Sequence, residues 1–261
     1  MPATATAIGS IMGAMPSRHF VTWPCALALA LVACGTTNRD AIEHLRSDYA
    51  AERTRLAGFV ALLPPSPTVT NPTFAAFSPP LVWGDVARGE AAGTNAAFFS
   101  YGQLASPDVH PIDRGPDVVM SSELVDCLRW TGPRSPMSES ALGNRDGDQL
   151  EARCRAALAV PYLVVLRPGV FQAPIATSPE TYAPGVLSMD VIVLDHASGR
   201  VIATARVVGT SAPRVEYVYE EGSDPAEALS RFAYSSLWSS VRQAIAAAFA
   251  GGGHRVSTAG T

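Results

Sequence analysis

The sequence predicts an α+β fold, because its second half places strand-like segments before a long amphipathic helix. Residues 161–167 form a largely apolar run, ended by Pro168 and Gly169, which is typical of a central strand buried on both faces. Residues 187–195 and 200–209 are two further strand segments, and the short polar loop between them predicts a hairpin. Together these elements predict a small antiparallel sheet with helices packed on one face.

A long helix closes this α+β domain, which we place at residues 118–250. Asp224 followed by Pro225 opens the helix, because aspartate caps helices and proline fits their first turn. The helix has an apolar stripe: Leu229, Phe232, Leu237, Val241, Ile245 and Phe249. Glycines 251–253 end the helix, and we expect the tail, residues 251–261, to be flexible.

An uncharged apolar run lies near the beginning of the chain. Residues 20–33 follow Arg18 and His19, and these fourteen residues would make a helix about 21 Å long. That is short for a hydrocarbon core of roughly 30 Å, and it is the length of the apolar region of a signal peptide. The run ends in Leu31-Val32-Ala33-Cys34, which resembles the lipobox of bacterial lipoproteins.

This resemblance implies lipid attachment to the Cys34 sulfur, cleavage before Cys34 and acylation of the new amino terminus. Residues 1–33 would then be a lipoprotein signal peptide and residues 34–38 a lipidated tether, so the partner through this lipid is a membrane. Gly35 stands where many inner-membrane lipoproteins have aspartate, which implies the cell envelope and its outer membrane as the location. The alternative is an uncleaved transmembrane anchor in which Cys34 is an ordinary cysteine.

The cysteine count then predicts a disulfide. Cys25 leaves with the signal peptide and Cys34 is lipidated, so the body retains the pair Cys127 and Cys154. A crosslink that closes a loop of roughly 28 residues stabilises a fold by about 3.5 kcal/mol. The alternative is two buried free thiols. A metal site is not predicted, because no histidine lies near either cysteine in the sequence.

An N-terminal helix is predicted for residues 39–63, with Asn38 as its cap. Glu52 interrupts an otherwise apolar stripe: Ile42, Leu45, Tyr49, Leu56, Phe59 and Leu63. The stripe favours a helix that packs on its own domain. The alternative is a helix that binds a partner or associates with itself next to the membrane.

Residues 64–117 are rich in proline and predict an irregular segment, with short strands at residues 81–83 and 96–99.

After residues 118–120, a helix is predicted from Ser121 or Ser122 to Trp130. Asp148 and Glu151 resemble a capping box that starts a second helix, ending near Val160. The disulfide would join these two helices.

The composition and motifs exclude several kinds of chemistry. All 19 basic residues are arginine, which excludes lysine nucleophiles and phosphate-loop lysines. A net charge of −4 gives no electrostatic basis for binding nucleic acid. Residues 144–148 resemble the opening of a calcium loop, but Gln149 and Arg155 occupy positions that require glycine and glutamate.

Histidines and acidic residues give no catalytic motif and predict no cofactor. His44, His110, His196 and His254 fall outside known metal-binding spacings, and His196 is expected to be a solvated turn residue. An acidic patch is predicted to be a solvated loop and helix start, with cation binding as the alternative; it comprises Glu216, Glu220, Glu221 and Asp224.

The hairpin carries a D-x-x-x-G pattern at Asp195 and Gly199. Its position before the last helix resembles small α+β domains of envelope-assembly and transport-accessory lipoproteins. That resemblance implies a noncatalytic binding or scaffolding protein with an envelope protein as its partner. The alternative is an envelope hydrolase or small-ligand binder whose site is assembled from residues distant in the sequence.

Overall fold

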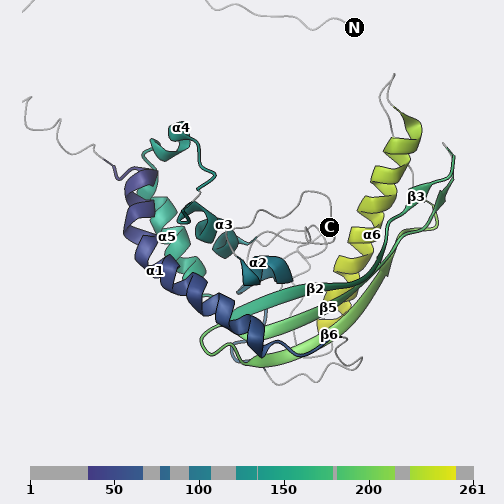
Figure 1. Ribbon diagram of the computed structural model, residues 1–261, viewed down its shortest axis with the longest axis horizontal. Coiled ribbons are helices and arrows are strands. Elements are labelled where there is room, and N and C mark those ends of the chain that lie inside the picture. Colours follow the sequence, from purple (N-terminus) through teal and green to yellow (C-terminus); the bar gives the residue numbers. More distant parts are fainter. Residues whose placement is uncertain are drawn as a thin grey trace, which may run out of the picture. The chain divides into compact units, whose positions relative to one another are not determined.

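A four-stranded sheet with helices on both faces forms the centre of the fold (Figure 1). The computed structural model describes residues 35–66, 77–82, 94–106, 122–133, 135–178, 181–214 and 224–250. Residues 35–261 group into one unit, and residues 1–34 into another. The predicted α+β class is confirmed.

The sheet has the strand order β1-β2-β5-β6. Its strands are β1 (Ala96–Ser100), β2 (Tyr162–Gln172), β5 (Val186–Asp195) and β6 (Val201–Thr210). The β5–β6 hairpin and its antiparallel pairing to β2 were predicted. The sheet is nevertheless mixed rather than antiparallel, because β1 pairs with β2 in parallel. Helices connect β1 to β2, and such a crossover brings the second strand back in the same direction.

Alternate residues of β2 contribute to two separate cores. Tyr162, Val164 and Leu166 pack with the closing helix α6 (Pro225–Ala250), whereas Leu163 and Val165 belong to the core on the other face. The prediction of helices on one face only is therefore wrong. A strand that is apolar on both faces needs a helix layer on each side to remove both sets of side chains from water.

The second face is covered by the N-terminal helix α1 (Asn38–Phe59), which continues as a short 3₁₀ helix, η1 (Val60–Leu62). Its cap is Thr37 rather than Asn38, because Thr37 and Asp40 form a reciprocal capping box. Five residues of the predicted stripe are buried: Ile42, Leu45, Tyr49, Leu56 and Phe59. The helix thus packs on its own domain, and the stripe is not available to a partner.

Among the described residues between β1 and β2, the chain forms four short helices: α2 (Tyr101–Ala105), α3 (Glu123–Trp130), α4 (Glu139–Leu142) and α5 (Gly147–Leu158). Helix α5 begins before the predicted start at Asp148, which lies in its first turn, where a carboxylate is favourable. Its start is held in place by the Gly147 N–H, which donates to the Thr36 carbonyl.

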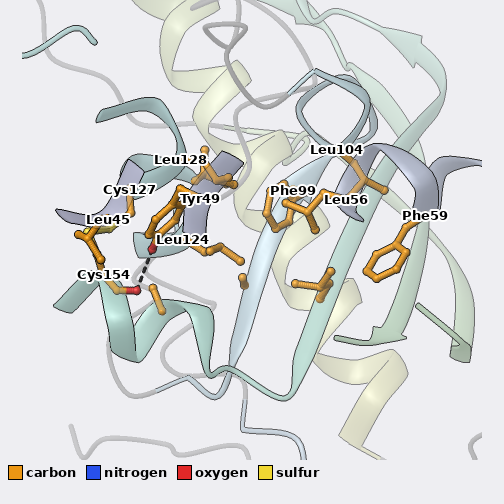
Figure 2. Packing of buried hydrophobic residues seen from close by; sticks show 14 of the residues in the cluster. Leu45, Tyr49, Leu56, Phe59, Phe99, Leu104, Leu124, Cys127, Leu128 and Cys154 are labelled. Carbon is orange, nitrogen blue, oxygen red and sulfur yellow. Dashed lines mark hydrogen bonds between the residues drawn. A yellow bond between two sulfur atoms is a disulfide. The ribbon is translucent and has the colours of Figure 1, made fainter. Parts of the chain in front are cut away.

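The predicted disulfide joins α3 and α5. Cys127 and Cys154 are buried and bonded, with their Cα atoms 5.7 Å apart. Figure 2 shows the bond at one end of the apolar core, where the Tyr49 hydroxyl of α1 donates a 2.7 Å hydrogen bond to the Cys154 carbonyl. Three helices are therefore connected around one buried crosslink.

Strand β2 continues beyond the predicted end at Pro168. The pairing with β5 shifts register between Pro168 and Phe171, and this irregularity accommodates the proline without ending the strand. The extension leads into a second, two-stranded sheet of β3 (Ile175–Ala176) and β4 (Tyr182–Ala183). The strand is therefore longer than the sequence predicted, and its extension lies beside α6.

The hairpin turn packs against α1. Gly199 adopts a φ of +70°, and a Cβ atom there would lie 2.4 Å from the Phe59 ring. Glycine is required at this position both for its backbone conformation and for the space that the ring occupies.

Several predictions fall on residues outside the described ranges. They concern residues 1–34 with Cys34, Trp83, residues 118–120, His110, His254, Glu216, Glu220, Glu221 and the tail, residues 251–261. Leu81 and Val82 are described and do not form a strand. In α6, Phe232 is partly exposed and Ala233 is buried, so the apolar stripe is rotated relative to the prediction.

Candidate functional site

A buried ionisable cluster connects α1 to the β5–β6 turn. Glu52 Oε1 lies 2.9 Å from His196 Nε2, and the two side chains are 6% and 3% exposed. Arg55 binds the other Glu52 oxygen at 2.5 Å and donates a 2.7 Å hydrogen bond to the His196 carbonyl. His196 Nδ1 donates to the Val160 carbonyl at 2.6 Å, since a carbonyl oxygen can only accept.

This cluster corrects two expectations from the sequence. Glu52 interrupts the apolar stripe because it is the partner of a histidine 144 residues away. His196 is buried rather than solvated, because α1 packs against the turn that carries it. Burial alone would raise the pKa of Glu52, but hydrogen bonds and charge from His196 and Arg55 hold that pKa below its usual value. Glu52 and His196 are buried between α1 and the turn, and their contacts stabilise the docking of α1.

A second polar cluster lies on the same face of the sheet. Asp190 is 1% exposed, with Arg167 at 3.1 Å and Arg206 at 3.8 Å. Arg167 also donates to the Pro64 carbonyl, and the Ser66 hydroxyl donates to Asp190. These bonds hold the chain just after η1 against the sheet. They also give the buried Asp190 carboxylate polar partners, without which its burial would be costly.

The candidate binding site is a pocket between α6 and the extension of β2, which we call the α6 pocket. Its volume is about 480 Å³, within the range of roughly 300–1,000 Å³ that is usual for ligand sites. Figure 1 shows the part of the sheet that leads to β3 running alongside α6. The pocket is lined by Phe171, Ala173, Pro174, Glu227, Ser230, Arg231 and Tyr234.

Two aromatic rings, which we call the floor, line part of the α6 pocket. Phe171 and Tyr234 pack edge to face with their ring centroids 6.1 Å apart, and Tyr234 makes a similar contact with Trp238 at 6.0 Å. Burial raises the pKa of Tyr234, so its hydroxyl is protonated at neutral pH. The floor therefore offers an apolar surface and no base.

The rim of the α6 pocket is charged. Glu227 and Arg231 lie one helical turn apart, 3.5 Å from each other, and both side chains are largely exposed. Ile175, which follows Pro174 in the chain, is 61% exposed. Phe232 is also partly exposed, but at about 3.6 residues per turn it lies on a different side of α6 from the four helix residues that line the pocket.

The described residues that line the α6 pocket include no nucleophile paired with a base. Ser230 lines the pocket, but no histidine or cysteine lines it with Ser230 to activate its hydroxyl. Within the described ranges, no group of three or more histidine, cysteine or acidic residues is placed to hold a metal ion. None of the described helices is both long and apolar enough to cross a membrane.

The pocket residues were missed in the sequence, although one signal was present. Glu227, Ser230, Arg231 and Tyr234 have the spacing of one helix face, next to the stripe assigned to the core. Phe171 and Pro174 were overlooked because Pro168 and Gly169 suggested that the strand ended there. Of the predicted site residues, Cys127 and Cys154 are brought together, Cys34 lies outside the described residues, and Asp224 directly precedes α6.

No protein-family model matches the chain, and no curated protein matches its sequence. The interpretation of the site therefore depends on its own geometry.

We predict that Glu52→Gln lowers the stability at neutral pH by about 1.5–3 kcal/mol, because it replaces a buried carboxylate that lies within hydrogen-bond distance of Arg55 and His196 by a neutral amide. The pKa of Glu52 is lowered in the folded state, so its contribution is complete above the unfolded value near 4.3 and is lost as the pH falls through the folded value. The difference in melting temperature between wild type and variant should therefore shrink below about pH 4.

The matched control is Glu43→Gln, because Glu43 is a half-exposed residue of the same helix paired with Arg46. It should change the stability by less than about 1 kcal/mol. Equal melting temperatures of wild type and the Glu52 variant at pH 7 would refute the role given to this cluster.

Proposed function

We propose that this chain is a membrane-anchored envelope lipoprotein whose body is a noncatalytic binding protein. The observation that carries the binding role is the α6 pocket, a cavity of about 480 Å³ lined in part by the rings of Phe171 and Tyr234, with the exposed side chain of Ile175 directly after Pro174 in the chain. A concave site lined by apolar and aromatic side chains together with a few polar groups is typical of binding sites.

The anchor is supported by the segment Leu31-Val32-Ala33-Cys34 and the apolar run before it. The disulfide between Cys127 and Cys154 supports export, because such bonds persist in oxidising compartments. Gly35 rather than aspartate after the acylated residue favours the outer membrane.

A binding role fits the site better than hydrolysis does. The charged side chains of the rim are exposed and pair with each other, whereas catalytic acids and bases are usually held in enclosed surroundings that shift their pKa. The ionisable groups that are enclosed, Glu52 and His196, serve to dock α1. The volume of the α6 pocket makes binding of a small molecule the second candidate.

We predict that Cys34→Ser abolishes incorporation of labelled palmitate and leaves an uncleaved precursor, because thioether formation requires the Cys34 sulfur. Cys25→Ser is the matched control: it lies in the same apolar run and should leave labelling unchanged. Metabolic labelling followed by gel fluorography checks both variants. Palmitate that persists in the Cys34 variant would rule out the anchor.

We also predict that a photoreactive benzoylphenylalanine at position 175 crosslinks an envelope component in intact cells, because Ile175 is exposed and directly follows Pro174, which lines the α6 pocket. Leu62 is the matched control position, since it is an apolar side chain of similar exposure, 52% against 61%, at the end of η1. The readout is a slower-migrating band that depends on irradiation. No adduct at position 175, or equal adducts at both positions, would contradict binding through this surface.

A further inference from the structure

We propose that the outer edge of β6 binds an extended segment of a partner protein as an additional strand of the sheet, with an acidic side chain of that segment opposite Arg206. This surface is separate from the α6 pocket, so the inference goes beyond the proposed function and does not depend on it. It is carried by the unpaired backbone groups of β6 and by the charges of the residue row that ends on this strand.

Strand β6 lies at the edge of the sheet, and alternate backbone groups along it point away from β5 (Figure 1). The Ser211 N–H donates to the carbonyl of the residue just before β5, which fixes the alternation of the ladder. The odd-numbered positions of residues 205–209 therefore bond to β5. The N–H and C=O groups of Thr204, Arg206 and Val208 point outward, and in the described part of the chain no group forms a hydrogen bond with them.

This outer edge, residues 204–208, lacks the features that usually protect an edge strand. Protected edges are short, or carry proline, several charges or a bulge. Strand β6 has ten residues, none of them proline, and Arg206 is its only charged residue. The register shift in the β5–β6 pairing lies between Val193 and Leu194, opposite the start of β6. By contrast, the other edge strand, β1, has five residues that are all buried.

The length and exposure of the edge suit one short strand. Residues 204–208 span about 17 Å at roughly 3.4 Å per residue, the length of an ordinary strand. Val208 is 56% exposed, so an incoming backbone can reach this part of β6. Beyond it the edge is closed by α6, because the Thr210 N–H donates a 3.2 Å hydrogen bond to Ser240 Oγ. Main-chain hydrogen bonds to a segment of about five residues would pair the outward groups.

A row of charged side chains across the sheet determines the charge of this segment. Arg167, Asp190 and Arg206 are direct register partners on β2, β5 and β6. The Asp190 carboxylate lies 3.1 Å from Arg167 and 3.8 Å from Arg206, so it is hydrogen-bonded only to the first. Two guanidinium groups thus share one carboxylate, and the row ends at the edge with a positive charge. A carboxylate opposite Arg206 on the added strand would continue the alternation, which is favourable for cross-strand pairs.

A second copy of this chain does not provide that carboxylate through β6. The strand contains no aspartate or glutamate. A two-fold β6–β6 pair would instead bring two copies of Arg206 into neighbouring positions, and like charges in such positions are unfavourable. The occupant that fits this edge is therefore a segment of another protein.

Binding of a designed peptide to the purified full chain tests the inference. The probe is Val-Thr-Val-Glu-Val-Thr-Val, which places glutamate in the middle of one strand face. At a concentration about ten times its Kd, amide exchange at Thr204, Arg206 and Val208 should slow about elevenfold, because these N–H groups are open to water only in the unbound fraction. Amides of residues 171–176, beside the α6 pocket, should exchange as before.

Variants separate the backbone contribution from the charge. Val208→Pro removes an outward N–H without loss of a bond to β5, and should weaken binding roughly fivefold, the effect of one hydrogen bond. Val208→Thr keeps that N–H and is the matched control. Arg206→Gln should weaken binding of the probe roughly two- to fivefold and remove its advantage over a peptide with glutamine in the middle.

The probe itself keeps the test decisive if Val208→Pro does not fold. N-methylation of the peptide amides should abolish binding to the unchanged chain, because the methyl groups block the ladder. Unchanged exchange along the edge, or equal binding of the methylated peptide, would overturn the added strand. Equal affinity for the glutamate and glutamine peptides would overturn the acidic partner.

Sedimentation of the chain without the probe tests the remaining occupant. Self-association that Val208→Pro abolishes would assign the edge to a second copy and overturn the inference. We expect no association that depends on this residue. The crosslink at position 175 is independent of these results, so a failure here leaves the proposed function standing, and a missing crosslink leaves this inference standing.

Discussion

The fold depends on one constraint: the central strands β2 and β5 are apolar on both faces. Residues 162–166 of β2 are all buried, and alternate side chains enter different cores. A sheet of this kind is stable only between two helix layers, because either face left open would expose a large apolar area to water. Helix α6 supplies one layer, and α1 with α3 and α5 supplies the other.

The second layer is assembled from distant parts of the chain and is held by polar and covalent links. The Glu52–His196 pair docks α1 on the hairpin turn, and the disulfide connects α3 to α5. The Tyr49 hydroxyl then ties α1 to the same crosslink (Figure 2). The α6 pocket lies at the other end of the assembly from these links in the chain, beside the first half of α6, and we assign binding to it.

Local patterns in the sequence predicted the elements better than their assembly. Hydrophobic alternation and turn chemistry identified β5, β6 and α6, and the cysteine count identified the disulfide. The parallel pairing of β1 could not be read from a short run of alanine and phenylalanine, because strand direction depends on the connection and not on composition.

The site was harder to predict for a related reason. A proline within a strand usually marks its end, but a register shift carries β2 past Pro168 and forms one wall of the pocket. Similarly, Glu52 and His196 have no local pattern, since their pairing exists only after α1 docks on the turn. Long-range contacts of this kind are properties of packing rather than of sequence periodicity.

Native-state hydrogen exchange tests the central claim that both helix layers and the sheet form one cooperative unit. With increasing denaturant, amides of α1 and of residues 162–166 in β2 should open with the same free energy, because they share one apolar core. Residues 171–176, beside the pocket, should exchange faster. If α1 exchanges at a much lower free energy while β2 remains protected, the helix is not part of the unit and the account is contradicted.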